Sequence, residues 1–143
     1  MSRFMLKRTI NAPLDTVWAA ADFTKSAGPF PMKAQTAGDP DKNGAGFTRA
    51  VTSGSKTVIE RLLEVDPMCS YTYTLVEGAP VKEDYRGKVE FMPKGSATEL
   101  VWSAEFTAKI PGAGWLGALV IRSTVAKIVD AIEAECRTKA ISS

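Results

Sequence analysis

The chain has 143 residues, of which 45% are hydrophobic and 24% are charged, and its net charge is +2. This length and composition predict one domain over 1–143 with a sizeable core, and the mixed charges argue against a nucleic-acid partner. The absence of histidine excludes Ser-His-Asp and Cys-His nucleophiles and metal sites that need imidazole. We therefore expect no metal and no cofactor, and acid–base chemistry would have to use carboxylate, lysine, tyrosine or water.

No run of residues is long and apolar enough to span a bilayer, and the first ten residues lack the apolar core of a secretion signal. We therefore expect a cytoplasmic protein without stable membrane insertion. Cys69 and Cys136 are far apart and lack metal-ligand spacing, so we expect reduced thiols rather than a disulfide.

The N-terminal part predicts a strand and then helix. Phe4, Leu6 and Ile10 alternate with polar residues over a first strand at 3–11. Asn11 and Pro13 suit a helix start, and a short apolar stripe follows at Leu14, Val17, Trp18 and Ala21. We expect a second short helix near 24–27, which Gly28-Pro29-Phe30-Pro31 would end.

Turn-forming residues divide the next part into strands at 32–37, 46–52, 56–65, 69–76, 82–92 and 98–109. Links this short indicate antiparallel neighbours. Alternation predicts inward-facing residues at Tyr71, Tyr73, Tyr85, Leu100, Trp102, Ala104 and Phe106. The strand at 56–65 stays ambiguous, because Glu60 lies on one of its apolar faces and Arg61 on the other.

The last stretch, from Trp115 to about Lys139, has the spacing of one long helix with an apolar face. Apolar residues recur there at three- and four-residue steps, at Ala118, Ile121, Val125, Ile128, Val129, Ile132 and Cys136. Because most of the preceding chain is predicted as strand, we expect the sheet to cover this face. The prediction is an α+β fold: a curved antiparallel sheet of about seven strands wrapped around a long C-terminal helix, with two short helices after the first strand. Such a fold tends to leave a cavity.

Gly112-Ala113-Gly114-Trp115-Leu116-Gly117 matches the GxGxxG dinucleotide fingerprint letter for letter. That fingerprint works within a βαβ unit whose second strand carries an acid for the ribose, and only the helix follows here. We therefore interpret these glycines as residues that let the loop turn and the helix pack closely. The backbone amides of this helix start could still hold an anionic group of a ligand.

Each inward aromatic residue, taken alone, fits an ordinary core. Together they indicate more, because two tyrosines on one strand face must each place a hydroxyl, and a cavity would supply water or a ligand for it. Glu60 is either solvated or inward. An inward Glu60 would need a cation or a donor, and Lys33 and the Tyr85 phenol are the candidates.

Several stretches resemble the START-related helix-grip proteins, which include polyketide cyclases and dehydratases, lipid-transfer domains, birch-pollen-type allergens and plant abscisic-acid receptors. The resemblance lies in the order of elements and in Ile10-Asn11-Ala12-Pro13-Leu14-Asp15-Thr16-Val17-Trp18, Glu60-Arg61-Leu62, Asp84-Tyr85-Arg86-Gly87 and Thr98-Glu99-Leu100-Val101-Trp102-Ser103. It covers essentially the whole chain, and these motifs specify fold better than activity.

The resemblance implies roles for individual residues. In the hormone receptors, a glutamate in a Glu-Arg-Leu stretch and a tyrosine on the following strand pair reach the polar network of the pocket, and Glu60 and Tyr85 match them. Lys33 is the nearest equivalent of the lysine that meets the ligand carboxylate. The chain departs from the receptors at Ala104, where they have a further acid, and it lacks their gate histidine.

Three functions follow as expectations. The leading one is a protein that encloses a small hydrophobic or amphipathic ligand, such as a lipid, polyketide or aromatic compound, using Phe30, Lys33, Glu60, Tyr71, Tyr73, Tyr85, Trp102, Phe106, Trp115 and Leu119. The second is a cofactor-independent cyclase or dehydratase in which Glu60 takes a proton, Tyr85 donates one and Lys33 stabilises the enolate. The third is a homodimer or partner-binding protein that uses the apolar start of the last helix, Trp115-Leu116-Leu119-Val120.

Overall fold

The computed structural model describes residues 1–142, and it describes side chains as far as Lys139. The elements along this part of the chain are β1 (Ser2–Ile10), α1 (Leu14–Ala20), β2 (Met32–Thr36), the 3-10 helix η1 (Pro40–Lys42), β3 (Thr48–Ser53), β4 (Lys56–Asp66), β5 (Ser70–Glu77), β6 (Arg86–Lys94), β7 (Ala97–Phe106) and α2 (Gly114–Ser142). No helix in the described chain has a stretch long and apolar enough to span a membrane.

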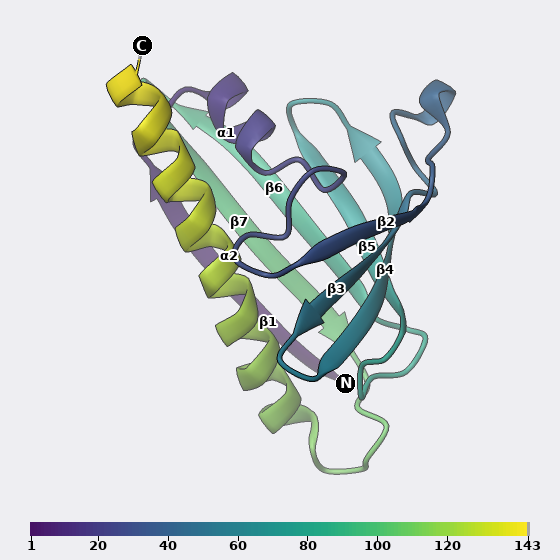
Figure 1. Cartoon of the computed structure of the whole chain (residues 1–143). Helices are drawn as coiled ribbons and strands as arrows, with labels where there is room; N and C mark the ends of the chain where they lie inside the picture. Colours follow the sequence, from purple (N-terminus) through teal and green to yellow (C-terminus); the bar gives the residue numbers. More distant parts are fainter. Residues whose placement is uncertain (143) are drawn as a thin grey trace.

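The seven strands form one antiparallel sheet in the order β1-β7-β6-β5-β4-β3-β2. Figure 1 shows this sheet curving around one side of α2, which runs diagonally across it. The predicted α+β helix-grip architecture is therefore confirmed. The alternation predicted for the later strands is confirmed as well, because Val89, Phe91, Leu100, Trp102 and Phe106 are all buried.

Helix α2 presents the predicted stripe to the sheet. Val125, Val129, Ile132 and Cys136 are buried, and they supply the hydrophobic contact that holds the helix in place. On the edge of this contact, Arg8 of β1 donates to Asp130 at 2.8 Å and to Glu133 at 3.1 Å. The hydrogen bond to Asp130 is the main cause that raises the pKa of Arg8.

Strand β4 resolves the ambiguity of its two apolar faces by a change of register. Glu60 faces inward opposite Arg49, and Leu62 faces inward opposite Tyr73. The pairing with β5 then shifts between Leu62 and Glu64, so that Val65 lies opposite Tyr71. An extra residue in one strand reverses the side-chain alternation beyond it, and Val65 therefore packs against the core on the same side of the sheet as Leu62.

A single short helix, α1, lies between β1 and β2 in the described chain, and the second short helix expected near 24–27 is a pair of turns. The amides of Lys25 and Ser26 both donate to the carbonyl of Asp22. The Asp22 carboxylate accepts from the amide and the hydroxyl of Thr24, at 2.9 and 2.7 Å. This local side-chain bonding competes with helix formation. The segment, here named loop 22–31, instead runs between α1 and β2.

The glycines of the GxGxxG match have packing roles. Gly112 has a φ of +81°, which turns the chain before α2. A Cβ at Gly114 would collide with the Ser2 hydroxyl, and one at Gly117 would lie 3.3 Å from the Phe106 ring. The sheet is antiparallel throughout, so the dinucleotide fingerprint has no βαβ context here.

Candidate ligand-binding cavity

A cavity of about 230 Å³ lies between the inner face of the sheet and the first half of α2. Apolar side chains form most of its wall, namely Phe30, Val51, Val58, Leu75, Ala79, Val120, Ile121, Val125 and Ile128. A smaller group of polar and amphipathic side chains interrupts this wall, at Arg49, Ser53, Lys56, Glu60, Tyr73, Tyr85, Trp102 and Thr124. An apolar wall with a few placed polar groups is typical of small-molecule sites.

The buried Arg49 and the partly buried Glu60 form an ion pair at the polar part of the wall. They lie directly opposite each other on β3 and β4, and the Arg49 Nε donates to Glu60 Oε1 at 2.8 Å. The side chain of Arg49 is only 4% exposed and that of Glu60 15%. Two charges this close and this shielded stabilise each other, and removal of either would leave the other without compensation.

Arg49 also holds loop 22–31 in place. Its Nη1 donates to the carbonyls of Phe23 and Ser26, at 2.8 and 2.9 Å. Its guanidinium carbon lies 3.7 Å from the centre of the Phe23 ring, which is a cation–π geometry. The same side chain therefore neutralises Glu60 and fixes the loop that borders the cavity.

A chain of hydrogen bonds links three aromatic residues of the wall. The Trp102 Nε1 donates to the Tyr73 hydroxyl at 3.0 Å, and the hydroxyls of Tyr73 and Tyr85 lie 3.1 Å apart. Burial raises the pKa of Tyr73 well above its usual value, and the neighbouring Tyr85 and Glu60 raise it further. Burial likewise raises the pKa of Tyr85. Both phenols are therefore protonated at neutral pH and able to donate.

Gly87 on β6 is the residue that lets Tyr73 adopt this position. It lies opposite Tyr73 in the β5–β6 pairing, and a Cβ there would collide with the phenol ring. The ring of Tyr73 thus occupies the space above a glycine, a known way to cover a glycine in a sheet. The Asp84-Tyr85-Arg86-Gly87 motif therefore supplies the Tyr85 hydroxyl and, at Gly87, the space for the ring of Tyr73, to which that hydroxyl is hydrogen-bonded.

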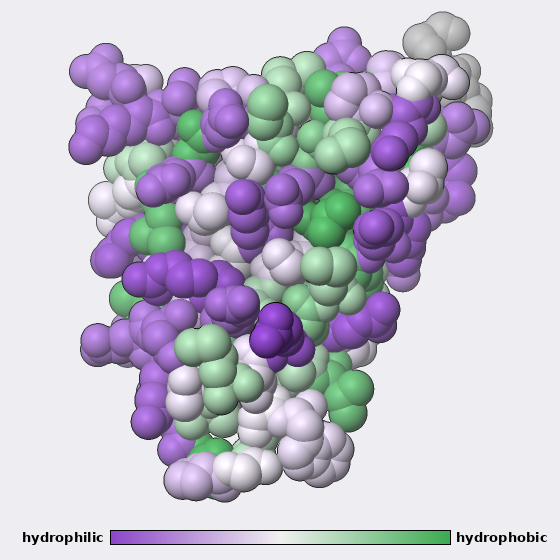
Figure 2. Space-filling view, turned by 180° about the vertical axis from the view of Figure 1, so that it is seen from behind, coloured by the Kyte–Doolittle hydropathy of each residue, from purple (hydrophilic) through white to green (hydrophobic). Residues whose placement is uncertain are grey.

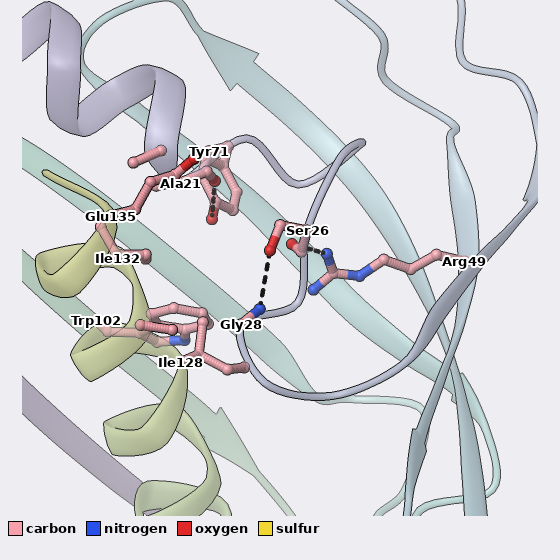
Figure 3. Close-up of a pocket in the computed structure, with 11 residues that line it drawn as sticks. Ala21, Ser26, Gly28, Arg49, Tyr71, Trp102, Ile128, Ile132 and Glu135 are labelled. Atoms are coloured by element: carbon pink, nitrogen blue, oxygen red, sulfur yellow. Dashed lines mark hydrogen bonds between the residues drawn. The ribbon is translucent and has the colours of Figure 1, made fainter. Parts of the chain in front are cut away.

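A second hollow, of about 240 Å³, lies on the other side of loop 22–31 and shares Arg49, Trp102 and Ile128 with the cavity. Figure 3 shows Ser26 and Gly28 of the loop between Arg49 and Ile128 of α2. Tyr71 belongs to this second hollow, and its hydroxyl donates to the carbonyl of Ala21 at 3.1 Å. The loop is therefore the partition between the two spaces.

A family model described as polyketide cyclase / dehydrase and lipid transport matches residues 1–140. The chain belongs to this family. A search of curated proteins gave no match to a member or to any other protein.

Solved structures share the fold of this chain at low sequence identity. Norcoclaurine synthase from Thalictrum flavum, a point mutant in complex with a transition-state analogue, has a TM-score of 0.76 at 17% identity, with 97% of this chain and 96% of that chain covered. The protein XoxI from Bacillus cereus has a TM-score of 0.74 at 17% identity, with 95% of this chain and 96% of that chain covered. Ara h 8.0201 has a TM-score of 0.72 at 17% identity, with 95% of this chain and 97% of that chain covered. These similarities show the fold of the family member and not its ligand.

Five of the predicted ligand-binding residues line one cavity in the structure: Phe30, Glu60, Tyr73, Tyr85 and Trp102. Tyr71 lines the second hollow, and Phe106 is completely buried behind the wall with its ring 5.8 Å from that of Tyr85. Their contact with a ligand stays a prediction, as do the catalytic roles predicted for Glu60 and Tyr85.

Three predicted residues lie elsewhere. Lys33 is exposed and pairs with Ala50, so it lies on the sheet face opposite to that of Arg49 and Glu60. The cation expected beside Glu60 is therefore Arg49 and not Lys33. Trp115 and Leu119 are 67% and 58% exposed and do not line the cavity. Figure 2 shows the back of the molecule, where hydrophobic side chains reach the surface toward the lower end, near the start of α2.

Sequence reasoning missed Arg49, although a signal was present. Phe47, Arg49 and Val51 share one face of the strand predicted at 46–52, and both apolar neighbours are buried. A charge on an apolar strand face indicates an inward residue with a partner. The Glu60-Arg61-Leu62 motif identified Glu60 as a candidate, but no motif covers the strand at 46–52 that carries Arg49.

Proposed function

We propose that this family member binds a small hydrophobic or amphipathic molecule in the cavity between the sheet and α2. The observation that carries this proposal is the cavity itself, an apolar space with a compact polar network on its wall. Ligand sites for drug-sized molecules have volumes on the order of 300–1,000 Å³. A space of about 230 Å³ suits a smaller guest of one or two rings.

Family membership supports this proposal, since the family description includes lipid transport and polyketide chemistry. One structural relative, norcoclaurine synthase from Thalictrum flavum, has been solved in complex with dopamine and hydroxybenzaldehyde, at 17% identity, a TM-score of 0.72 and 93% of this chain and 84% of that chain covered. Small aromatic compounds are therefore a reasonable first class of ligand to test. The cavity wall, with Tyr73, Tyr85 and Trp102, offers aromatic surfaces for such compounds.

The test compares two tryptophan substitutions on neighbouring positions of α2. Thr124 lines the cavity, whereas the adjacent Ser123 is exposed and lies outside its wall. Thr124→Trp should fill the space and lower the affinity for the two-ring fluorophore 1-naphthylamine, read by fluorescence, by at least roughly tenfold, because a buried ring of the probe is displaced. Ser123→Trp should bind the probe like the unchanged protein.

Thermal melts of both variants check that each is folded. Equal binding by the two folded variants would show that the probe does not occupy this cavity. The proposed function would be contradicted if the unchanged protein bound neither the probe nor any of the three naphthalene compounds used in the next subsection.

A second candidate is acid–base catalysis, which is favoured by the presence of Glu60 and Tyr85 on the same cavity wall. In this reaction Glu60 takes a proton next to a carbonyl while a phenol donates to the carbonyl oxygen. Arg49, and not Lys33, supplies the nearby positive charge. Exchange of the α-hydrogens of 2-tetralone in D₂O, followed by NMR, should be accelerated by the protein and not by Glu60→Gln. Equal rates for both proteins would remove this candidate.

A further inference from the structure

Between them, the hydroxyls of Tyr73 and Tyr85 carry two hydrogens, and only one of these has an acceptor among the described residues. The Tyr73 oxygen accepts from Trp102, and a single hydrogen bond joins the two phenols. If Tyr73 donates to Tyr85, the Tyr85 hydrogen has no acceptor among the described residues, and if Tyr85 donates, the Tyr73 hydrogen has none. Tyr73 is 3% exposed and Tyr85 1%, and both line the cavity. In either arrangement a buried O–H is available to an acceptor inside the cavity.

The charge of Arg49 is already engaged by protein groups. Its Nε donates to Glu60, and its Nη1 donates to two backbone carbonyls. Its Nη2 has no hydrogen-bond partner in the described part of the chain, so this nitrogen remains as a donor. The positive charge itself, however, is balanced by a carboxylate 2.8 Å away.

Glu60 contributes an acceptor and a negative charge to the same wall. Its Oε1 accepts from Arg49, while its Oε2 has no hydrogen-bond partner among the described residues. The Glu60 charge lies near enough to the phenols to raise the pKa of both Tyr73 and Tyr85, although burial is the larger cause. The polar network therefore has no net charge, and it combines free donors with one free acceptor.

An anionic ligand would bring an unbalanced charge to this network. Burying a carboxylate without a free cation is strongly unfavourable, because the lost hydration has no compensation. The other charged side chain of the wall is Lys56, which is exposed at the start of β4, four residues or roughly 13 Å along the strand from Glu60. Its charge is solvated and offsets little of that cost.

We propose that the cavity selects an uncharged ligand with a carbonyl-type oxygen, which accepts the free phenolic hydrogen of the Tyr73–Tyr85 pair, and discriminates against carboxylates of the same shape. This inference rests on the proposed function and adds the chemical class of the ligand. A hydrogen-bond donor beside that oxygen would find Glu60 Oε2 as its acceptor. The selectivity arises because Arg49, the buried cation of the wall, is already bound to the Glu60 carboxylate.

The test uses three naphthalene compounds of similar shape in isothermal titration calorimetry at neutral pH. 2-Acetonaphthone has a carbonyl and no charge, 2-naphthoate has a carboxylate, and 2-ethylnaphthalene has no oxygen. The ketone should bind roughly tenfold more tightly than the hydrocarbon, which is the effect of one net hydrogen bond, and the carboxylate should bind most weakly.

The matched variant combines Tyr73→Phe, Tyr85→Phe and Trp102→Phe. It removes both phenolic hydrogens and also the Trp102 N–H, which would lose its acceptor with the Tyr73 oxygen and become a new free donor on the wall. The ratio of ketone to hydrocarbon affinity should fall toward one in this variant. Because the ratio is taken within one protein, a general loss of stability does not affect it. If this variant fails to fold, the single Tyr85→Phe variant is used with the ketone and carboxylate pair, and the carboxylate should remain the weaker ligand.

The outcomes separate this inference from the proposed function. Tightest binding of 2-naphthoate, or equal binding of the ketone and the hydrocarbon to the unchanged protein, would overturn the selectivity and leave ligand binding intact. Binding of none of the three compounds, together with no binding of 1-naphthylamine, would overturn both.

Discussion

At the scale of single residues, Arg49 is the side chain on which most of the site depends. It joins Glu60 of the neighbouring strand to the Phe23 and Ser26 carbonyls of loop 22–31. Its replacement by Met keeps much of the side-chain volume and removes all of these donors. Arg49→Met should therefore lower the free energy of unfolding by about 3 kcal/mol, because the partly buried Glu60 carboxylate loses its partner and two loop carbonyls lose their donor.

Chemical denaturation measures this loss, and Arg61→Met is the matched control. Arg61 lies next to Glu60 on β4 but is exposed, so its replacement should change stability by no more than about 0.5 kcal/mol. Adding Glu60→Leu to Arg49→Met should restore part of the stability, since no unpaired charge then remains. Similar losses for Arg49→Met and Arg61→Met would contradict the assigned role of the buried pair.

At the scale of elements, loop 22–31 is the segment that divides the space beside α2. Gly28 has a φ of +66°, and a Cβ there would lie 2.8 Å from the Ile128 Cα of the helix backbone. Gly95, in the β6–β7 turn, has a φ of +63° with open space around it. Gly95→Ala should cost roughly 1–2 kcal/mol for the left-handed conformation alone. Gly28→Ala should cost a further 1–3 kcal/mol, roughly, because the loop must also move away from α2.

The difference between these two glycine variants isolates the contact between the loop and the helix. Urea denaturation of both gives that difference directly. Equal losses would mean that loop 22–31 does not press against α2 at Gly28.

At the scale of the whole molecule, α2 has two different surfaces along its length. Its middle and later turns bury Val125, Val129 and Ile132 against the sheet, whereas Trp115 and Leu119 in its first turns are exposed. Self-association through this apolar start stays a prediction. Sedimentation over a range of concentrations tests it, with Leu119→Glu as the variant in which any association should be lost.

The periodicity of the chain was sufficient to predict the sheet, the long helix and most of the inward side chains. A repeat of two in strands and of three to four in a helix depends only on local geometry and on the need to bury apolar groups, so both can be read from sequence. Glu60 and Tyr85, which were chosen for their place in motifs, both line the cavity, and their roles stay predictions. The position of Lys33 was wrong because an uncertain alignment located it, and no alternation on β2 supported an inward side chain.

The tertiary structure alone decided the rest. The bulge in β4, the pairing of Arg49 with Glu60 and the seating of Tyr73 above Gly87 all depend on which strands become neighbours and in what register. Register is a relation between segments distant in sequence, so no local pattern in either segment contains it. Apolar periodicity therefore determined that a core forms around α2, while the cavity and its polar network exist only because the strands meet in this one alignment.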